Sequence, residues 1–350
     1  MTNKANAVTR RALMTTGATA ALAGLCAPHV RIARSAPVTI RYATGGGIGP
    51  NEMETIIYLD WMQKNVLKGY GKDYTVDMTF TRGTPEAGTL LAASQADLAT
   101  LSFAVFATSV LKDVVPGGLT IVSDNYQDGR PGYAQNTFFV LKDSPIGSTH
   151  DLKGKKVGIN AFGSAVDLAL RVKLKKDGID PRRDLTIVEV AFPNQAAAIR
   201  EKRIDCGILI LPFMNAELRK GDLRALFTGG DAFGPYSVIF QVVTNDFLKK
   251  HPEAVRSYLA DYVRGLQWFY DPGNRKKAVE ITAEFTKSPA DVLDSYFMTE
   301  RDYYRDRNGC VAAAVIQRPI DAMQNEGLID RPVSISDHLD MSYLPFPCPA

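Results

Sequence analysis

Apolar and polar residues along the first hundred positions follow patterns that predict strands and helices in turn. Val38 to Tyr42 alternates as a strand does, and Asn51 to about Leu67 has helical spacing, with Pro50 just ahead of it. The segments that follow are predicted to be a strand at Tyr74–Thr81, a helix at Pro85–Ser94, a strand at Leu98–Leu101 and a helix at 103–114. This βαβα order is typical of a parallel sheet covered by helices.

The same order restarts in the middle of the chain. The pattern predicts strands at Val157–Asn160, Leu185–Val190 and Cys206–Leu211, and helices at Ser164–Lys176 and Gln195–Lys202. A further strand, Val238–Val243, returns either as a hairpin or as a crossover, and the chain from Asp246 onward is almost wholly helical. We therefore expect two α/β lobes with strands crossing between them and a helical C-terminal tail.

Five turns follow the predicted strands. In open parallel sheets, ligands bind beyond the carboxyl ends of the strands, where successive turns converge. We expect all five turns to face a cleft between the lobes, and they are Thr44–Gly49, Thr81–Ala87, Thr100–Ala104, Asn160–Ala165 and Leu211–Asn215.

The glycine-rich turn after the first strand does not fit a nucleotide site. Its sequence, GGGIGP from Gly45 to Pro50, has proline at the last glycine that a dinucleotide-binding turn requires, and no GK[ST] follows nearby. The bare backbone of this tight turn can instead approach a small ligand closely.

Ser164 begins a helix and has two possible roles. Ser164 and Asp167 fit a capping box, in which Asp167 reaches back to the N–H of the cap residue itself. The first helical N–H groups stay free in that arrangement, and the positive end of the helix favours an anion. The sequence allows Ser164 either to contact a ligand or only to cap the helix.

A buried anion also needs counter-charges or hydrogen-bond donors to replace its water. Arg82 and Arg130 are the candidate cations, although each also fits a solvated surface position. Aromatic residues near the turns can either stack on an aromatic ligand or pack in the core, and they are Phe103, Tyr126, Phe162, Phe213 and Tyr236.

Catalytic and metal-binding motifs are absent from the sequence. It contains no GxSxG, CxxC or HExxH, and its four histidines form no cluster with cysteine. We expect neither a metal nor a cofactor. Cys206 lies in an apolar run typical of a buried strand, whereas Cys310 and Cys348 can pair if the protein is exported.

Charge and composition bear on the compartment. The chain has 350 residues, of which 45% are hydrophobic and 23% charged, and a formal net charge of +3. The segment before Pro37 has no acidic residue and holds five basic ones, Lys4, Arg10, Arg11, Arg31 and Arg34, so the rest of the chain is slightly acidic. Binding to nucleic acid therefore lacks the basic face that it needs.

The same N-terminal segment predicts export. Thr9–Met14 resembles the twin-arginine motif, and the weakly hydrophobic run Ala12–Ala27 has the length of a signal peptide. A chance arginine pair before an alanine-rich helix is the alternative. We predict a signal peptide over residues 1–36, with cleavage after Ala27 or Ala36, and a periplasmic protein.

Two segments of the chain resemble a known family. The sequence IGSTHDLKGKKVGINAFGSAVDLALRVKLKKDGIDPRRDLTIVEV, followed by AAAIREKRIDCGIL, resembles the second lobe of solute-binding proteins of ABC importers in the nitrate, sulfonate, taurine and thiamine-precursor group. GTPEAGTLLAASQADLAT is similar to the matching part of the first lobe. The resemblance covers about Val38 to Tyr270.

The resemblance implies an α/β, two-lobed type II periplasmic binding protein fold with a helical C-terminal tail. Lobe 1 would comprise residues 37–138 and 239–350, lobe 2 would comprise residues 139–238, and the lobes would close on a ligand by a hinge at the crossing strands. Together with the turn analysis, it gives a candidate ligand site of Gly46, Gly47, Ile48, Arg82, Thr84, Ser102, Phe103, Arg130, Phe162, Gly163, Ser164 and Phe213.

The function that this family implies is a monomeric, non-enzymatic receptor. It would capture a small organic anion, a sulfonate or carboxylate that can be aromatic, and deliver it to an ABC permease in the membrane. The alternative is an enzyme on the same scaffold in pyrimidine or aromatic-acid metabolism, and a third possibility is a receptor that feeds a membrane sensor. The triple glycine departs from the family's usual turn and leaves the ligand open, and the cysteine-rich signature of the related pyrimidine synthases is missing.

Overall fold

The computed structural model of the chain describes residues 36–349. The predicted signal peptide, with its twin-arginine motif and possible cleavage after Ala27, lies outside the described residues except for Ala36. Within the described range, we find no helix whose length and apolarity would let it cross a bilayer.

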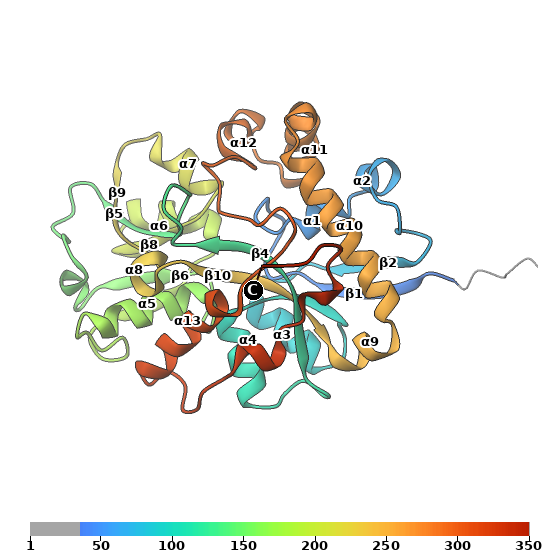
Figure 1. Ribbon diagram of the computed structural model, residues 1–350. Coiled ribbons are helices and arrows are strands. Elements are labelled where there is room, and N and C mark those ends of the chain that lie inside the picture. The colour runs from blue at the N-terminus through green and yellow to red at the C-terminus, as the bar shows by residue number, and fades with distance from the viewer. Residues whose placement is uncertain (1–35, 350) are drawn as a thin grey trace, which may run out of the picture. The chain divides into compact units, whose positions relative to one another are not determined.

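The first sheet has five strands in the order β2, β1, β3, β10, β4 (Figure 1). Its strands are β1 (Val38–Ala43), β2 (Tyr74–Thr79), β3 (Leu98–Ser102), β4 (Leu119–Asp128) and β10 (Tyr236–Thr244). β1 pairs in parallel with β2 and β3, whereas β10 runs antiparallel to both β3 and β4. The predicted returning strand is therefore β10, and it is inserted in an otherwise parallel sheet.

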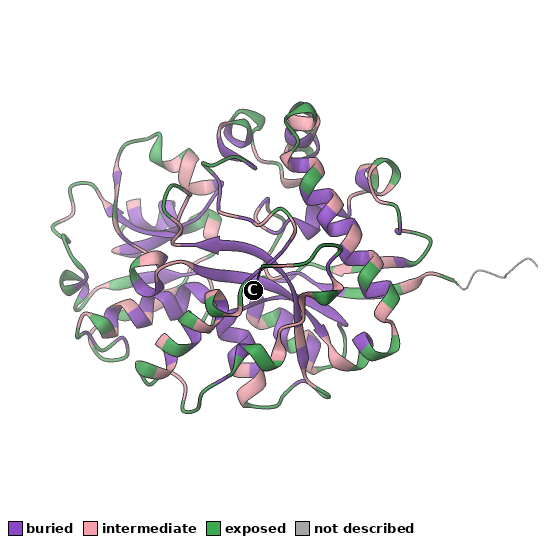
Figure 2. Cartoon of the chain, viewed as in Figure 1, coloured by how far each residue is buried: buried purple, intermediate pink, exposed green. Residues whose placement is uncertain are grey.

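The second sheet repeats this plan in the order β7, β6, β8, β5, β9. Its strands are β5 (Thr137–Leu141), β6 (Lys156–Ile159), β7 (Thr186–Glu189), β8 (Cys206–Leu209) and β9 (Leu223–Thr228). Here β6 pairs in parallel with β7 and β8, and β5 runs antiparallel to β8 and β9. The central strands of both sheets are largely buried (Figure 2), whereas most residues of the edge strands β2, β7 and β9 are not.

Helices cover these sheets and form the C-terminal part of the chain. The α-helices are α1 (Glu54–Ile57), α2 (Asp60–Asn65), α3 (Thr84–Ala92), α4 (Phe103–Leu111), α5 (Ala165–Lys176), α6 (Gln195–Arg200), α7 (Phe213–Leu218), α8 (Gly229–Phe233), α9 (Asn245–Lys250), α10 (Pro252–Tyr270), α11 (Arg275–Thr286), α12 (Ala290–Tyr296) and α13 (Ala313–Asn325). The 3₁₀ helices are η1 (Thr149–Leu152), η2 (Phe192–Asn194), η3 (Pro272–Asn274), η4 (Ile335–His338) and η5 (Met341–Tyr343). The helical tail predicted after Asp246 is confirmed.

The structure differs from the sequence prediction in two places. The helix predicted from Asn51 to about Leu67 is split into α1 and α2, because Leu59 is extended and the ring of Tyr58 stacks on Tyr258 of α10 at 5.0 Å. The strands β4, β5 and β9 were not predicted. β4 places polar side chains inside the protein, so it lacks the usual alternation, and they are Ser123, Asp124, Asn125, Gln127 and Asp128.

Asp128 joins the two connections between the sheets. Its buried carboxylate accepts hydrogen bonds from the N–H of Gly129 at 2.7 Å, the N–H of Asn136 at 3.3 Å and the hydroxyl of Tyr236 at 3.1 Å. Gly129 and Asn136 lie on the chain leaving the first sheet, and Tyr236 begins the strand that returns to it. Burial raises the pKa of Asp128 to about 7 and that of Asp124 on the same strand to about 6.

These raised pKa values predict how stability depends on pH. Because the folded protein holds these two protons more tightly than the unfolded chain does, their stabilisation is complete below about pH 4 and is lost as the pH rises through 6 and 7. The Asp128→Asn variant is expected to match the wild type in unfolding free energy at pH 4 and to exceed it at pH 8, measured by urea denaturation. A constant difference between the two proteins across this range would contradict the assignment.

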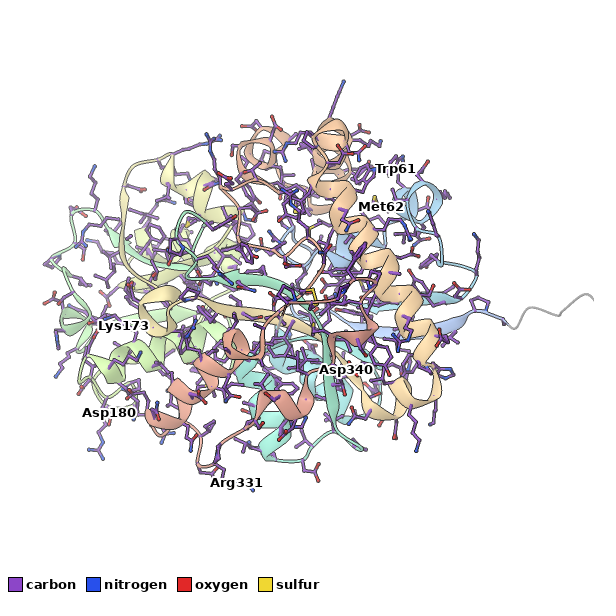
Figure 3. The ribbon with its side chains drawn as sticks, in the orientation of Figure 1. Trp61, Met62, Lys173, Asp180, Arg331 and Asp340 are labelled. Carbon is purple, nitrogen blue, oxygen red and sulfur yellow. A yellow bond between two sulfur atoms is a disulfide. The ribbon has the colours of Figure 1, made fainter. Side chains whose placement is uncertain are left out.

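A disulfide fastens the end of the chain. Cys310 and Cys348 are bonded across 38 residues, as the sequence allowed, and the bond is visible in yellow in Figure 3. Cys206 is free and buried in β8, as predicted.

Candidate functional site

All five predicted turns contribute to one cleft between the two sheets. The cleft has two adjoining compartments, which share Gly46, Gly47, Asn51, Glu52, Phe192 and Ile210. The turn after β1 thus reaches both compartments, and the second sheet supplies the facing wall through Phe192 and Ile210. The convergence expected from the strand order is confirmed.

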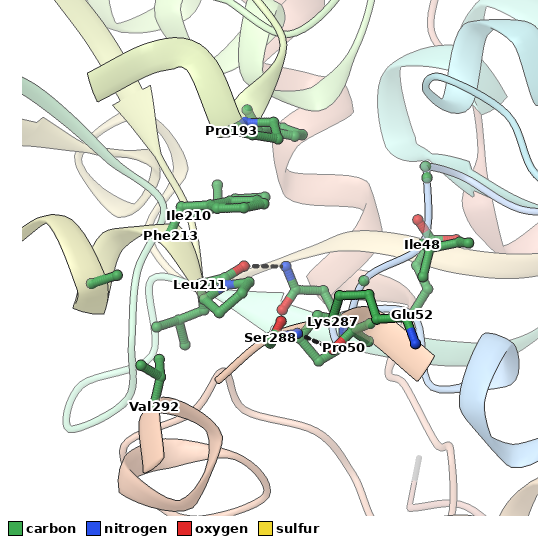
Figure 4. Close-up of a pocket in the computed structure, with 18 of the residues that line it drawn as sticks. Ile48, Pro50, Glu52, Pro193, Ile210, Leu211, Phe213, Lys287, Ser288 and Val292 are labelled. Carbon is green, nitrogen blue, oxygen red and sulfur yellow. Dashed lines mark hydrogen bonds between the residues drawn. The ribbon is translucent and has the colours of Figure 1, made fainter. Parts of the chain in front are cut away.

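The larger space, which we name the apolar compartment, has a volume of about 330 Å³. Its wall combines side chains of both sheets with the link between α11 and α12 (Figure 4), and its further lining residues include Ile48, Pro50, Pro193, Leu211, Phe213, Lys287, Ser288 and Val292. Most of this wall is aliphatic, aromatic or proline, so it suits a carbon skeleton.

The smaller space, which we name the polar compartment, has a volume of about 110 Å³. Besides the shared residues, its lining combines polar side chains with the start of α5 and with apolar residues of β10. They include Arg82, Thr84, Ser102, Asn136, Asn160, Ser164, Ala165, Val166, Val238 and Ile239. Such an arrangement offers hydrogen bonds that can orient a polar group of a ligand.

Ser164 caps α5 as expected, but the capping differs in detail. Its hydroxyl oxygen accepts from the N–H of Asp167 at 3.3 Å and donates to Asn160 Oδ1 at 2.9 Å. The carboxylate of Asp167 accepts from the N–H of Gly163 at 2.9 Å, instead of from the N–H of Ser164 itself. No hydrogen bond within residues 36–349 engages the N–H groups of Ala165 and Val166, which remain available at the positive end of the helix.

The first sheet adds a hydroxyl pair to the polar compartment. Thr84 donates to Ser102 Oγ at 3.0 Å, and this oxygen also accepts from the N–H of Val105, 3.3 Å away, at the start of α4. Since Ser102 Oγ already accepts twice, its own O–H proton can be donated into the cleft.

Glu52 places a nearly buried carboxyl group where the two compartments meet. It is 8% exposed, and one of its oxygens accepts from the N–H of Gly45 at 2.7 Å. A Cβ atom on Gly46 would lie 2.8 Å from Glu52 Oε1, so a side chain at this position would displace the carboxyl group. Burial raises the pKa of Glu52 well above its usual value, and repulsion from the buried Glu54 raises it further.

Glu54 is a second buried carboxyl group near Glu52. Burial dominates for Glu54 and raises its pKa overall, while donors from Thr100 and Asn125 stabilise its charge. Burial therefore favours the neutral form of both carboxyl groups.

Asn51 is held by hydrogen bonds to both its side chain and its backbone. Its Nδ2 donates to the carbonyl oxygen of Leu211 at 2.7 Å, shown as a dashed line in Figure 4. Its backbone carbonyl accepts from Arg305 at 3.2 Å. Arg305 is itself buried and paired with the buried Asp302 at 2.9 Å. This ion pair fixes the turn from behind.

The structure brings eight of the twelve predicted residues to the cleft. Gly46 and Gly47 line both compartments, Ile48 and Phe213 line the apolar one, and the polar one takes Arg82, Thr84, Ser102 and Ser164. The guanidinium of Arg82 is at the rim, since its side chain is 94% exposed and paired with Glu86 at 3.2 Å.

The other four predicted residues do not line these compartments. Phe103 is buried and packs edge-on against Phe233, and Arg130 donates to Gln127 and lies over the ring of Tyr304. Phe162 is 48% exposed, and Gly163 has a left-handed φ of +75° while its N–H is taken by Asp167. Phe103, Arg130 and the N–H of Gly163 thus have partners other than a ligand, whereas the ring of Phe162 is exposed outside the two compartments.

Sequence reasoning also missed residues that line the cleft. Asn51 and Glu52 were assigned to a regular helix and so carried no expectation of contact. The segment Thr286–Pro289 comes from the C-terminal helices, and only its spatial return to the turn after β1 brings it there. Within the described part of the chain, no cluster of three or more His, Cys, Asp or Glu side chains is arranged to hold a metal ion.

Solved structures with this architecture establish the fold. The periplasmic aliphatic sulphonate binding protein of Escherichia coli matches with a TM-score of 0.60 at 20% identity, over 86% of this chain and 97% of that one. The periplasmic nitrate-binding protein of Synechocystis matches with a TM-score of 0.66 at 13% identity, over 88% and 87%. The chain therefore has the periplasmic binding protein fold, as the resemblance implied.

Sequence comparison then gives the family. Residues 66–274 match the NMT1/THI5-like family, and the chain belongs to it. A nitrate/nitrite binding protein of Nostoc is 26% identical over 159 residues, which are 44% of this chain and 36% of that protein. A taurine-binding periplasmic protein of Escherichia coli is 25% identical over 190 residues, 52% and 59% of the two chains. The matches thus span from about a third to three fifths of these relatives.

Proposed function

We propose that the protein is an extracytoplasmic solute-binding receptor of an ABC importer. It captures a small organic anion, a sulfonate or a carboxylate, in the cleft and delivers it to a membrane permease. The receptor is a monomer that is exported by the twin-arginine route and needs neither a cofactor nor nucleic acid. Its relatives of known description, which bind nitrate, nitrite or taurine, support this class of ligand.

One observation carries the proposal: turns from both sheets meet at a single cleft that has uncommitted hydrogen-bond donors. The N–H groups of Ala165 and Val166 and the hydroxyl of Ser102 come from three different positions on two sheets. Several donors around one small space can replace the water of an anion, which a single helix end does not do.

Closure would come from relative movement of two lobes, residues 37–138 with 239–350 and residues 139–238. The chain crosses between the sheets at Gly129–Asn136 and again before Tyr236, and these short links are where a hinge would lie. Ile48 and Phe162, which follow β1 and β6, are 54% and 48% exposed. We expect closure to bury both side chains.

An enzyme on the same scaffold is the alternative, and the site does not favour it. Of the two neighbouring carboxyl groups, only Glu52 lines the polar compartment, whereas Glu54 is fully buried and accepts from Thr100, Asn125 and Tyr42. A carboxylate so enclosed does not reach a substrate. The relatives cited above are described as binding proteins.

A ligand screen tests the receptor. The melting temperature of the purified full chain is measured with sulfonates, aromatic carboxylates, nitrate and pyrimidines. We expect a sulfonate or carboxylate to raise it, and Ser164→Ala to weaken that shift. Thr228→Ala is the matched control, because Thr228 caps α8 in the same way, outside both compartments.

Both serine and threonine variants should lose about 1 kcal/mol of unfolding free energy as lost helix caps, so their difference in ligand response isolates the contact. No shift with any sulfonate or carboxylate would refute the organic-anion receptor. Conversion of the bound compound, followed by mass spectrometry, would establish the enzyme in its place.

A further inference from the structure

We infer that the ligand carries an N–H donor, such as an amino group, in addition to its anionic group, and that Asn51 and Glu52 together receive this donor. The inference rests on the proposed function, because it describes the second end of the ligand held in the same cleft. It follows from the unpaired buried Oδ1 of Asn51 and from the carboxyl group of Glu52, which borders the same cleft.

Asn51 provides the first acceptor. Its Oδ1 is buried and accepts no hydrogen bond from the described residues, although Asn51 lines both compartments. The amide cannot simply be turned around, since its Nδ2 donates to the Leu211 carbonyl oxygen, which can only accept. An unpaired buried acceptor is costly, so a donor from the ligand would stabilise the complex at this point.

Glu52 provides the second acceptor beside it. The N–H of Gly45 occupies one lone pair of Glu52 Oε2 at 2.7 Å. A carboxyl group has further acceptor lone pairs in either protonation state, and those of Glu52 border the cleft. A ligand amino group, which has two or three N–H bonds, can bond to Glu52 and to Asn51 Oδ1 at once.

The donors for the anionic group lie on other elements. Ala165 and Val166 belong to α5, which follows β6 of the second sheet, whereas Asn51 and Glu52 follow β1 of the first. An anion without a donor would satisfy the α5 side and leave Asn51 Oδ1 unpaired. A ligand with both groups would satisfy the two sides together.

The apolar compartment narrows the class further. An inorganic anion has no carbon skeleton that could fill this volume of about 330 Å³ or contact the aliphatic and aromatic wall. We therefore expect an amino-substituted organic anion whose carbon skeleton contacts residues such as Ile210, Phe213 and Val292.

Matched ligand pairs test this inference by isothermal titration of the full chain. The pairs are 2-aminoethanesulfonate and ethanesulfonate, 3-aminobenzenesulfonate and benzenesulfonate, and 3-aminobenzoate and benzoate. In at least one pair we expect the amino compound to bind at least about 10-fold more tightly than its partner, as a donor meeting two desolvated acceptors should.

Two variants assign the preference to the acceptor pair. Glu52→Met removes the carboxyl at similar length, and Asn51→Ala removes the unpaired amide oxygen with less effect on the buried carboxyl pair. Each is expected to reduce the preference for the amino compound to about 2-fold or less, with smaller changes for the partner compound. Glu253→Met is the control, because that glutamate is on α10 with a side chain 87% exposed.

The possible failures are distinguishable. Equal binding within all three pairs would overturn the inference and leave the anion receptor standing. Binding of none of the six compounds would overturn the proposed function and the inference with it. If both variants still prefer the amino compounds, Asn51 and Glu52 do not bind the amino group.

Discussion

Asp261→Ala is expected to lower the free energy of unfolding by about 3–5 kcal/mol, which is a large part of the stability of an ordinary domain. Asp261 lies on α10 and is 1% exposed. Its carboxylate accepts from the N–H groups of Lys68 at 2.8 Å, Gly69 at 2.8 Å and Tyr70 at 3.1 Å, and from the hydroxyl of Tyr74 at 3.0 Å. Alanine would leave these donors without an acceptor in a site too buried for water to replace it.

The Asp261 prediction is checked by urea denaturation with two further variants. Asp261→Asn keeps the shape and one oxygen, so it should cost less than alanine. Asp60→Ala is the surface control, because Asp60 is 77% exposed and pairs only with Lys64 on the same helix, and a change below about 1 kcal/mol is expected. Equal losses for Asp60→Ala and Asp261→Ala would show that the buried carboxylate is not what fastens α10 to the turn before β2.

Regular alternation explains which strands the sequence predicts. β1, β2, β6 and β7 show alternating or continuous apolar runs, and helices such as α5 and α10 show an apolar face, so local pattern and structure agree. β4 carries Asp124 and Asp128 inside the protein, where each is satisfied by partners far along the chain, such as Ser237 and Tyr236. Local pattern does not reveal such partners, and the strand was missed for that reason.

In the candidate site too, the local sequence predicts some features and contacts with distant residues determine the others. Turns after strands can be placed from sequence because strand direction fixes where they meet. The direction of a single side chain depends on its partners. Arg82 reaches the rim and Arg130 does not, because Gln127 and Tyr304 hold the latter elsewhere.

Asn51 and Glu52 show most clearly what the sequence alone does not predict. The sequence predicts that they lie in a helix, yet they precede α1. Their role depends on distant contacts, such as the hydrogen bond from Asn51 to Leu211, which follows β8. The long-range contact that fixes Asn51 also leaves its oxygen unpaired. Only the folded chain contains both facts.

Replacing Cys310 and Cys348 by serine is expected to cost about 4 kcal/mol of unfolding free energy. The bond closes a loop across 38 residues and so restricts the unfolded chain. Releasing a loop of this length is expected to lower the free energy of unfolding by about this amount, because the unfolded chain gains conformational entropy. Urea denaturation of the oxidised wild type and the double variant measures it, with dithiothreitol as an internal control. The reductant should bring the wild type down to the stability of the variant and leave the variant unchanged.

Part of the C-terminal segment should stay in place without the disulfide. Asp340 donates its N–H to the Ile121 carbonyl of β4 at 3.0 Å, Arg256 donates to the Ser342 carbonyl at 2.7 Å, and the guanidinium of Arg256 lies 4.4 Å from the ring centre of Tyr343. These contacts belong to the folded state, whereas the disulfide acts mainly on the unfolded chain, so the folded structure should persist while its stability falls. The double variant is therefore expected to keep the far-ultraviolet circular dichroism and the ligand affinity of the wild type. A loss of less than about 1 kcal/mol would mean that the unfolded chain is already restrained around residues 310–348.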